Sequence, residues 1–221
     1  DNGVDMIFNL TKSNLEINNQ LKNFAEKNKI IRLHSKISEQ KKLLFLSEIP
    51  QLIYQELKID LPPEIFLQAS QKGQKSIVAE IKNFIKSKPK IKSIADLYCG
   101  IGTYSFALPR NISVTGFEGN EIMVESINKN STKNNLQNFI CAKKRDLVLN
   151  PLNISELKNY DLILINPPRS GAKSQTEMLA KSDVKNIIMI SCNPHSFIND
   201  AMILKNSGYK ITKLAAIDQF Y

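Results

Sequence analysis

One of the three cysteines in the sequence has neighbours that suit a reactive thiol. Cys192 lies in the sequence Ser-Cys-Asn-Pro, between an apolar run that ends at Ile190 and a segment with helical spacing. The start of a helix favours the thiolate, which is the nucleophilic form of the side chain. Cys192 is therefore the candidate nucleophile, whereas Cys99 and Cys141 are predicted to be inert core residues.

A glycine motif, Asp-Leu-Tyr-Cys-Gly-Ile-Gly-Thr, covers residues 96–103. Gly100 and Gly102 allow a tight turn and a close approach to a ligand, and Asp96 can accept a hydrogen bond from a ligand hydroxyl or face a cation. Ser105 stands where a dinucleotide fingerprint has its third glycine, and an acid beside the turn would repel a pyrophosphate. The motif therefore favours a cationic nucleoside such as S-adenosylmethionine, and an ordinary glycine turn is the alternative.

Two acidic residues follow later strand-like runs. Glu118 ends the run that begins at Val114, about twenty residues after the glycine motif, where an acid that binds ribose hydroxyls is expected. Asp146 follows the next run and is a weaker candidate for the adenine edge. The alternatives are a helix-start residue for Glu118 and an ordinary loop acid for Asp146.

A proline loop, Asn-Pro-Pro-Arg, covers residues 166–169 directly after another apolar run. Pro167 and Pro168 fix a rigid loop, which suits a site that must hold a flat base. Arg169 can pair with a phosphate or a carboxylate. A plain proline-rich turn is the alternative.

Strands and helices alternate from residue 74 onwards. The predicted strands cover residues 91–97, 113–117, 139–142, 161–165 and 186–190, with a closing strand at 209–217. The predicted helices cover residues 74–87, 121–134, 175–181 and 195–206. This alternation predicts an α/β, Rossmann-like fold with a parallel sheet between helices. The motifs above all follow the carboxyl ends of the predicted strands, so they fall at one edge of the sheet. Ligands bind at that edge in such folds.

The first part of the chain reads as a small mixed α/β segment. We expect strands at 6–10, 30–33 and 43–46, and a helix capped by Ser13, with Glu16 as its capping-box partner. The pair Pro62-Pro63 marks a boundary. The expected domains are therefore residues 1–62 and 63–221.

Composition narrows the class of protein further. The 221 residues carry a net charge of +9, which favours polyanionic partners. The cysteines form no C-x-x-C pair, so we expect no metal site and no iron–sulfur cluster in this chain, and their odd number suggests a reducing, cytoplasmic setting. No apolar run is long enough for a membrane span and no secretory leader is evident, so we expect no membrane association. The chain begins with Asp1 rather than Met, from which we expect a fragment, and we expect a monomer.

In their order along the chain, these motifs resemble those of the bacterial uracil-5 RNA methyltransferases that modify ribosomal or transfer RNA. Two further segments resemble family motifs: Phe-Leu-Gln-Ala-Ser at 66–70 resembles Phe-x-Gln-x-Asn, and Ile-Asp-Gln-Phe at 217–220 resembles the segment before the closing Ser/Thr-x-His-x-Glu motif. The resemblance implies a class I S-adenosylmethionine-dependent fold. It also implies methylation of carbon 5 of a uridine, with ribosomal RNA slightly favoured, through a covalent adduct with Cys192.

The resemblance also implies roles for individual residues. Cofactor contacts are implied for Gln68, Tyr98, Thr103, Glu118 and Asn166.

Substrate contacts are expected from Gln68, Pro167 and Arg169, and we interpret His195 as a capping or RNA-facing residue rather than a general base. RNA phosphates are expected to contact the dense lysines Lys72, Lys75, Lys82, Lys86, Lys88, Lys90 and Lys92, for which a solvated face is the alternative.

The sequence departs from the family pattern at several places. Asn166 stands where the family has Asp, which removes a charge, and Ser70 stands where it has Asn. The family's amino-terminal RNA-binding barrel, its cysteine-rich segment, its catalytic Glu and its last strand are expected outside this chain.

Three rival functions are weighed against this one. An amino-group methyltransferase acting on adenine or glutamine has an aromatic residue after Asn-Pro-Pro, where Arg169 stands here, and needs no cysteine. A non-catalytic RNA-binding module with the same fold stays open until methyl transfer is assayed. A nicotinamide dehydrogenase is disfavoured by the missing third glycine and by Asp96.

Overall fold

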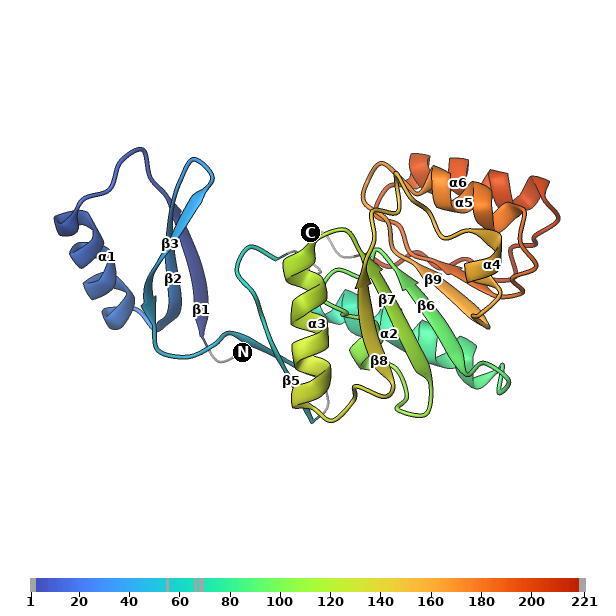
Figure 1. Cartoon of the computed structure of the whole chain (residues 1–221), viewed down its shortest axis with the longest axis horizontal. Helices are drawn as coiled ribbons and strands as arrows, with labels where there is room; N and C mark the ends of the chain where they lie inside the picture. Colours follow the sequence, from blue (N-terminus) through green and yellow to red (C-terminus); the bar gives the residue numbers. More distant parts are fainter. Residues whose placement is uncertain (1–2, 55, 66, 68–69, 219–221) are drawn as a thin grey trace. The chain divides into compact units, whose positions relative to one another are not determined.

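The computed structural model describes residues 3–54, 56–65, 67 and 70–218 (Figure 1). The chain divides into two compact units, Asp1–Ile65 and Phe66–Tyr221. The boundary expected at Pro62-Pro63 lies just before this division. Among the described helices, none combines the length and the apolar character that crossing a membrane requires.

The first unit contains a three-stranded sheet, one helix and a hairpin. Its elements are β1 (Val4–Asn9), α1 (Leu15–Lys27), β2 (Ile30–Ile37), β3 (Gln40–Leu46), β4 (Gln51–Tyr54) and β5 (Leu57–Asp60). The central strand β2 pairs parallel with β1 and antiparallel with β3, and β4 pairs antiparallel with β5. Ala25 of α1 packs against Leu33 and Leu44 of the sheet.

The cap of α1 differs from the prediction. Asn14 caps the helix, because its Oδ1 accepts a hydrogen bond from the Ile17 amide at 2.8 Å. The Ser13 hydroxyl instead donates to the Asn18 side chain. The prediction that Ser13 and Glu16 form the cap is therefore wrong. Ser and Asn are both good caps, and their adjacency in the sequence does not indicate which one the backbone selects.

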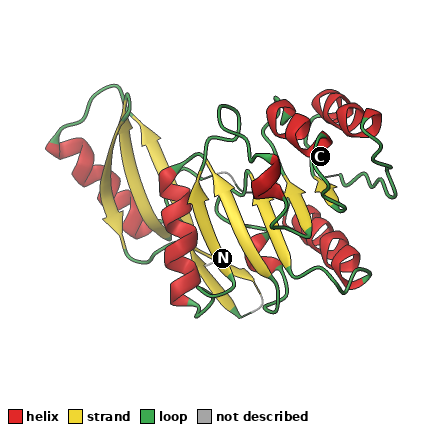
Figure 2. Cartoon of the chain, turned by 45° about the vertical axis from the view of Figure 1, so that its right-hand side comes forward, coloured by secondary structure: helices red, strands yellow, loops and turns green. Residues whose placement is uncertain are grey.

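The second unit is built on a five-stranded parallel sheet (Figure 2). Its strands are β6 (Ser93–Leu97), β7 (Ser113–Glu118), β8 (Ile140–Lys144), β9 (Leu162–Ile165) and β10 (Ile187–Met189). The order across the sheet is β10-β9-β6-β7-β8, and all the pairs are parallel. The predicted α/β fold class is confirmed. Because the chain order reverses at β6, the crevice between β6 and β9 is the place where such sheets bind ligands.

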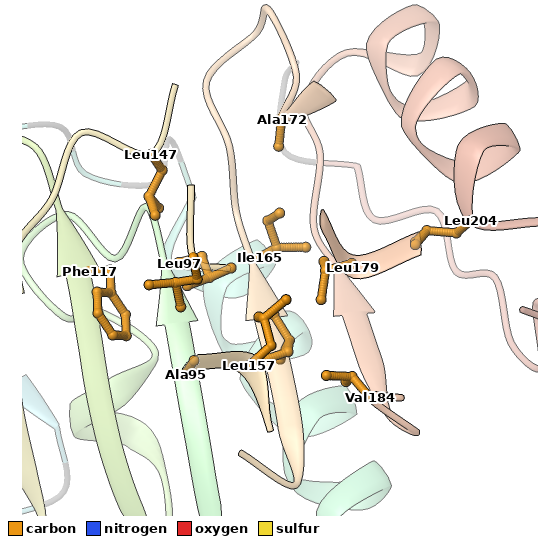
Figure 3. Packing of buried hydrophobic residues seen from close by; sticks show 12 residues of the cluster. Ala95, Leu97, Phe117, Leu147, Leu157, Ile165, Ala172, Leu179, Val184 and Leu204 are labelled. Carbon is orange, nitrogen blue, oxygen red and sulfur yellow. The ribbon is translucent and has the colours of Figure 1, made fainter. Parts of the chain in front are cut away.

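Helices precede, connect and follow the strands of this sheet. They are α2 (Gln71–Lys86), the 3-10 helix η1 (Ser105–Ala107), α3 (Glu121–Lys133), α4 (Ile154–Leu157), α5 (Lys173–Ala180) and α6 (Pro194–Asn206). In the core of the sheet, Leu97 lies between Phe117 and Ile165 (Figure 3). All residues of β9 are buried, as expected for a strand that is covered on both faces.

The closing strand predicted at 209–217 is wrong. No residue of that range belongs to a strand, and the side chains of Ile211 and Leu214 are 61% and 72% exposed. The segment is held by side chains instead: the Tyr209 hydroxyl donates to the carbonyl of Val184 at 2.7 Å, and Lys213 pairs with Glu80 of α2. An alternation of apolar and polar residues indicates only the direction in which successive side chains would point. A strand also requires a neighbour with free backbone groups.

Candidate active site at the carboxyl edge of the sheet

The sequence motifs converge on one edge of the parallel sheet. The glycine turn follows β6, Glu118 ends β7, Asn166 follows β9, and Cys192 lies between β10 and α6. Parallel strands all end at the same edge, so residues that are distant in sequence reach one side of the fold.

The glycine turn has a positive φ at its two glycines, as expected for that residue type, and also at Tyr98, where the residue type does not predict one. Tyr98, Gly100 and Gly102 have φ of +58°, +58° and +79°. A Cβ on Gly100 would meet no atom within 4 Å, whereas a Cβ on Gly102 would lie 3.1 Å from the Phe106 ring. Gly102 therefore packs against the core, and Gly100 borders open space that a ligand can enter.

Glu118 braces this turn. One carboxylate oxygen accepts a hydrogen bond from the Gly100 amide at 3.0 Å, and the other accepts one from the Asn120 amide at 2.9 Å. The carboxylate therefore lies beside the open side of the turn. Its acceptor oxygens suit the two hydroxyls of a ribose.

Asp96 of β6 lies in the interior of the fold rather than at its surface. It is fully buried, and its Oδ2 accepts a hydrogen bond from the Ser105 hydroxyl at 2.6 Å. Its Oδ1 is buried without a partner among the described residues. Burial raises the pKa of Asp96 to about 7, against the opposing effect of the Ser105 hydrogen bond. In the sequence, Ser105 is notable only because it stands in place of a third glycine, so its contact with Asp96 was not predicted.

Tyr98 supplies a second buried group without a partner. Its hydroxyl makes no hydrogen bond in the part of the chain that the structure describes. Burial raises the pKa of Tyr98 to about 12, and the carboxylates of Asp200 and Asp146 add to the effect. Two orphaned polar atoms beside the open turn at Gly100 fit a bound ligand that carries hydrogen-bonding groups.

Asp146 has a local structural task. Its Oδ1 accepts hydrogen bonds from the amides of Val148 and Leu149 at 2.9 and 3.1 Å, so it closes the turn after β8. This is what a loop acid does, and its contact with an adenine stays a prediction. Thr103 is half-buried in the glycine motif. Gln68 lies outside the described residues.

The proline loop leaves the sheet beside the glycine turn. The Asn166 amide donates to the Leu97 carbonyl at 3.2 Å, and Pro167 is buried. Arg169 is exposed, and its guanidinium forms no ion pair with any described residue. An unpaired cation next to a rigid loop suits an anionic substrate.

Cys192 is exposed, directly before α6. The cap of α6 is Asn193, whose Oδ1 accepts a hydrogen bond from the His195 amide at 3.1 Å, and Pro194 occupies the first helical turn. The capping interpretation of His195 is therefore wrong, and His195 is exposed.

The other two cysteines differ from each other. Cys99 is buried, as predicted, and burial raises the pKa of its thiol well above the usual value. The prediction that Cys141 lies in the core is wrong, because it is exposed on the edge strand β8. Within the described residues, no group of three or more His, Cys, Asp or Glu side chains could hold a metal ion.

The lysine-rich stretch is divided by the fold. Lys72, Lys75, Lys82 and Lys86 recur at helical spacing along α2, on a face away from the buried Ile77, Ile81 and Ile85. Lys88, Lys90 and Lys92 are exposed in the turn that follows. No ion pair is formed by any of these seven lysines within the described residues.

The sheet order and the glycine turn define a class I S-adenosylmethionine-dependent methyltransferase fold. The chain is similar in structure to the tRNA (uracil-54, C5)-methyltransferase of Pyrococcus abyssi, solved in complex with S-adenosyl-L-homocysteine. The TM-score is 0.77 with 20% sequence identity, and the match covers 97% of this chain and 52% of the other.

A family model described as tRNA (Uracil-5-)-methyltransferase matches residues 9–221, so the chain belongs to that family. It is 34% identical over 171 residues to an uncharacterized RNA methyltransferase of Rhizobium meliloti, covering 77% of this chain and 40% of the relative. It is 31% identical over 173 residues to the 23S rRNA (uracil(1939)-C(5))-methyltransferase of Vibrio vulnificus, covering 76% and 39%. The chain thus spans less than half the length of these relatives.

Proposed function

We propose that this chain is the catalytic part of an enzyme that transfers a methyl group from S-adenosylmethionine to carbon 5 of a uridine in RNA. The observation that carries the proposal is the placement of an exposed cysteine, Cys192, at the sheet edge that also bears the open glycine turn. Membership in the family supports the same reaction.

The residues around the glycine turn are proposed to hold the cofactor. Glu118 would bind the ribose hydroxyls, and the unpartnered Asp96 Oδ1 and Tyr98 hydroxyl would gain partners from the ligand. Gly100 leaves room for the ligand's close approach. Further contacts are proposed for Gln68, Gly102, Thr103, Asp146 and Asn166.

Cys192 is proposed to activate the target base. Carbon 5 of uracil is a weak nucleophile, and addition of the Cys192 sulfur to carbon 6 forms a C–S bond while the ring's electron pair moves towards carbon 5 and the neighbouring carbonyl. The bound cofactor supplies the electrophilic methyl group. Loss of the carbon 5 proton to a base then restores the double bond and expels the Cys192 thiolate. Covalent catalysis of this kind replaces one difficult step with easier ones.

The proline loop is proposed to receive the flipped base. A base must leave its stack before a thiolate can reach carbon 6. Pro167 and Pro168 make the loop rigid, and the unpaired Arg169 guanidinium would bind a phosphate beside the base.

The proposal is tested by trapping the adduct. The chain is incubated with S-adenosylmethionine and a transcript of the large ribosomal RNA made with 5-fluorouridine, and intact mass is measured. Fluorine at carbon 5 cannot leave as the proton does, so the adduct should accumulate. We expect Cys192→Ser to abolish it and Cys141→Ser, which alters the other exposed cysteine, to leave it unchanged. An adduct that persists in Cys192→Ser would show that the nucleophile is another residue.

Ribosomal RNA is the proposed substrate in preference to transfer RNA. The relative from Vibrio vulnificus, named for 23S rRNA, shares 31% identity, whereas the enzyme from Pyrococcus abyssi, named for tRNA, is matched at 20% and shows the fold alone. A fluorinated tRNA transcript in the same trapping assay decides between the two. Faster trapping by tRNA would reverse the preference.

The lysine face of α2 is proposed to contact the RNA backbone. Each phosphate contact adds roughly 0.7–0.9 to the slope of log affinity against log salt. Replacing Lys72, Lys75, Lys82 and Lys86 with Ala should therefore lower the slope by about 3, as measured by filter binding between 50 and 200 mM salt. An unchanged slope would leave this face as solvated surface.

A further inference from the structure

Two hydrogen bonds join the proline loop to the helix that follows Cys192. The Asn193 side-chain amide donates from Nδ2 to the Arg169 carbonyl at 2.8 Å, and the Ala172 amide donates to Asp200 Oδ2 at 2.8 Å. The two contacts lie at either end of a four-residue stretch, Arg169 to Ala172. This stretch is thereby fixed to the first two turns of α6.

The packing between these contacts leaves no room for a side chain at residue 171. Gly171 has φ of +86°, and a Cβ there would lie 2.9 Å from Asp200 Oδ2 and 3.0 Å from the Ser196 Cβ. Asp200 is 3% exposed. Burial raises the pKa of Asp200, while the hydrogen bond from the Ala172 amide lowers it. The loop therefore rests directly on α6.

Asn193 uses both ends of its side-chain amide. Its Oδ1 accepts the hydrogen bond from the His195 amide and caps α6, so its Nδ2 is the end left to face the proline loop. Its backbone amide also donates to the Ser191 hydroxyl at 3.1 Å. The residues on both sides of Cys192 are thus held in one arrangement.

We propose that Asn193 is a positioning residue that sets the place of the Cys192 thiol relative to the proline loop. The inference rests on the proposed function, in which that loop receives the target base. Nucleophilic attack requires the sulfur to lie close to carbon 6 in the correct direction, and a misplacement of about 1 Å can cost on the order of 100-fold in rate. The donor end of Asn193 controls this placement, and its acceptor end only caps the helix.

Two substitutions separate the two ends of the amide. Asn193→Ser and Asn193→Asp both keep a good cap for α6 but remove the donor to the Arg169 carbonyl. The serine variant adds no charge beside the thiol, so any effect the two share comes from the lost donor. Asn14→Asp is the matched control, because Asn14 caps the equally long helix α1.

The experiment measures thiol reactivity and adduct formation separately. Alkylation of Cys192 by iodoacetamide reports the thiol alone, whereas single-turnover trapping by saturating fluorinated ribosomal transcript reports the thiol placed against a base. For Asn193→Ser and Asn193→Asp we expect trapping to slow about 10–100-fold. For Asn193→Ser the alkylation rate and thermal midpoint should stay close to those of the unaltered chain, and Asn14→Asp should trap at the unaltered rate.

Each other outcome overturns a distinct claim. Trapping at the unaltered rate in Asn193→Ser would show that the loop contact does not position the thiol. A parallel fall in alkylation and trapping, or a large fall in the thermal midpoint, would show that Asn193 acts only through the thiol or the helix cap. An adduct in Cys192→Ser would instead refute the proposed function and leave the geometry of Asn193 without a catalytic role.

Discussion

The two halves of the sheet's carboxyl edge satisfy their polar groups in opposite ways. Beside β6, Asp96 Oδ1 and the Tyr98 hydroxyl are buried without partners among the described residues, and Gly100 borders open space. Beside β9 and β10, Asn193 and Asp200 are bonded to the proline loop across two helical turns.

This difference indicates which half contains buried polar groups that a ligand could complete. A buried polar group without a partner costs about 1–3 kcal/mol, which a ligand can recover by supplying the missing hydrogen bond. The β6 half contains two such groups, as expected of a cofactor site. The β9–β10 half has its donors and acceptors already placed, as expected of groups that must hold a geometry before the reaction begins.

The largest expected effect tests how tightly the β9–β10 half is packed. Gly171→Ala should lower the free energy of unfolding by about 2–4 kcal/mol, through left-handed strain of about 1–2 kcal/mol and crowding against Asp200 and Ser196. Gly208→Ala is the control, because Gly208 also has a positive φ but a Cβ there would meet nothing within 4 Å. Urea unfolding measures both, and equal losses would mean that the loop is not packed tightly on α6.

The next effect tests the unsatisfied carboxyl of the β6 half. Because burial raises the pKa of Asp96 in the folded chain to about 7 from an ordinary 3.8, the folded state holds its proton more tightly than the unfolded state does. The contribution of Asp96 to the free energy of unfolding is therefore greatest below pH 3.8, declines as the pH rises towards 7, and does not change further above pH 7. Between pH 5 and 7 we expect a loss of about 1–3 kcal/mol.

The variant Asp96→Asn isolates this effect. Its amide oxygen can still accept the hydrogen bond from Ser105, but the side chain no longer titrates. Urea unfolding at pH 5 and pH 7 should therefore show a smaller decline in the variant than in the unaltered chain. Equal declines would mean that the pH dependence comes from other groups, such as the buried Asp200, whose pKa is also raised by burial.

Sequence patterns predicted the parts of the site that depend on strand ends. The apolar run of β9 and the run that ends at Glu118 both predicted strands, and β9 is buried throughout, as expected of a parallel strand that is covered on both faces. Their carboxyl ends then fix where Glu118 and Asn166 lie. The glycines of the turn were also predictable, since positive φ favours that residue.

Contacts between loops were not predictable from the sequence. The bond from Asn193 to the Arg169 carbonyl joins residues 24 positions apart, and nothing in the motif distinguishes the donor end of an amide from its acceptor end. The hydrogen-bond partner of Asp96 is Ser105, which in the sequence is notable only because it stands where a dinucleotide-binding motif has a glycine. The prediction of a closing strand at 209–217 was wrong for a related reason. A strand must pair with a neighbouring strand, and the sequence of these residues does not reveal whether one is available.

The smallest expected effect concerns Glu118 and the affinity of the β6 half for its ligand. Its carboxylate accepts hydrogen bonds from the Gly100 and Asn120 amides, so its oxygens are held beside the open turn. Losing such an acceptor costs about 1–3 kcal/mol. Glu118→Ala should therefore weaken S-adenosylmethionine binding roughly tenfold or more by titration calorimetry.

A matched control separates this effect from a general loss of negative charge. Glu121 lies three positions further on. Among the described residues its side chain forms only an exposed ion pair with Lys144 at 2.8 Å, and such pairs contribute little to stability. Glu121→Ala should bind the cofactor as the unaltered chain does. If both variants bind normally, Glu118 braces the turn without touching the ligand. The contrast between the two halves would then rest on Asp96 and Tyr98 alone, because only those two would remain as groups that a ligand completes.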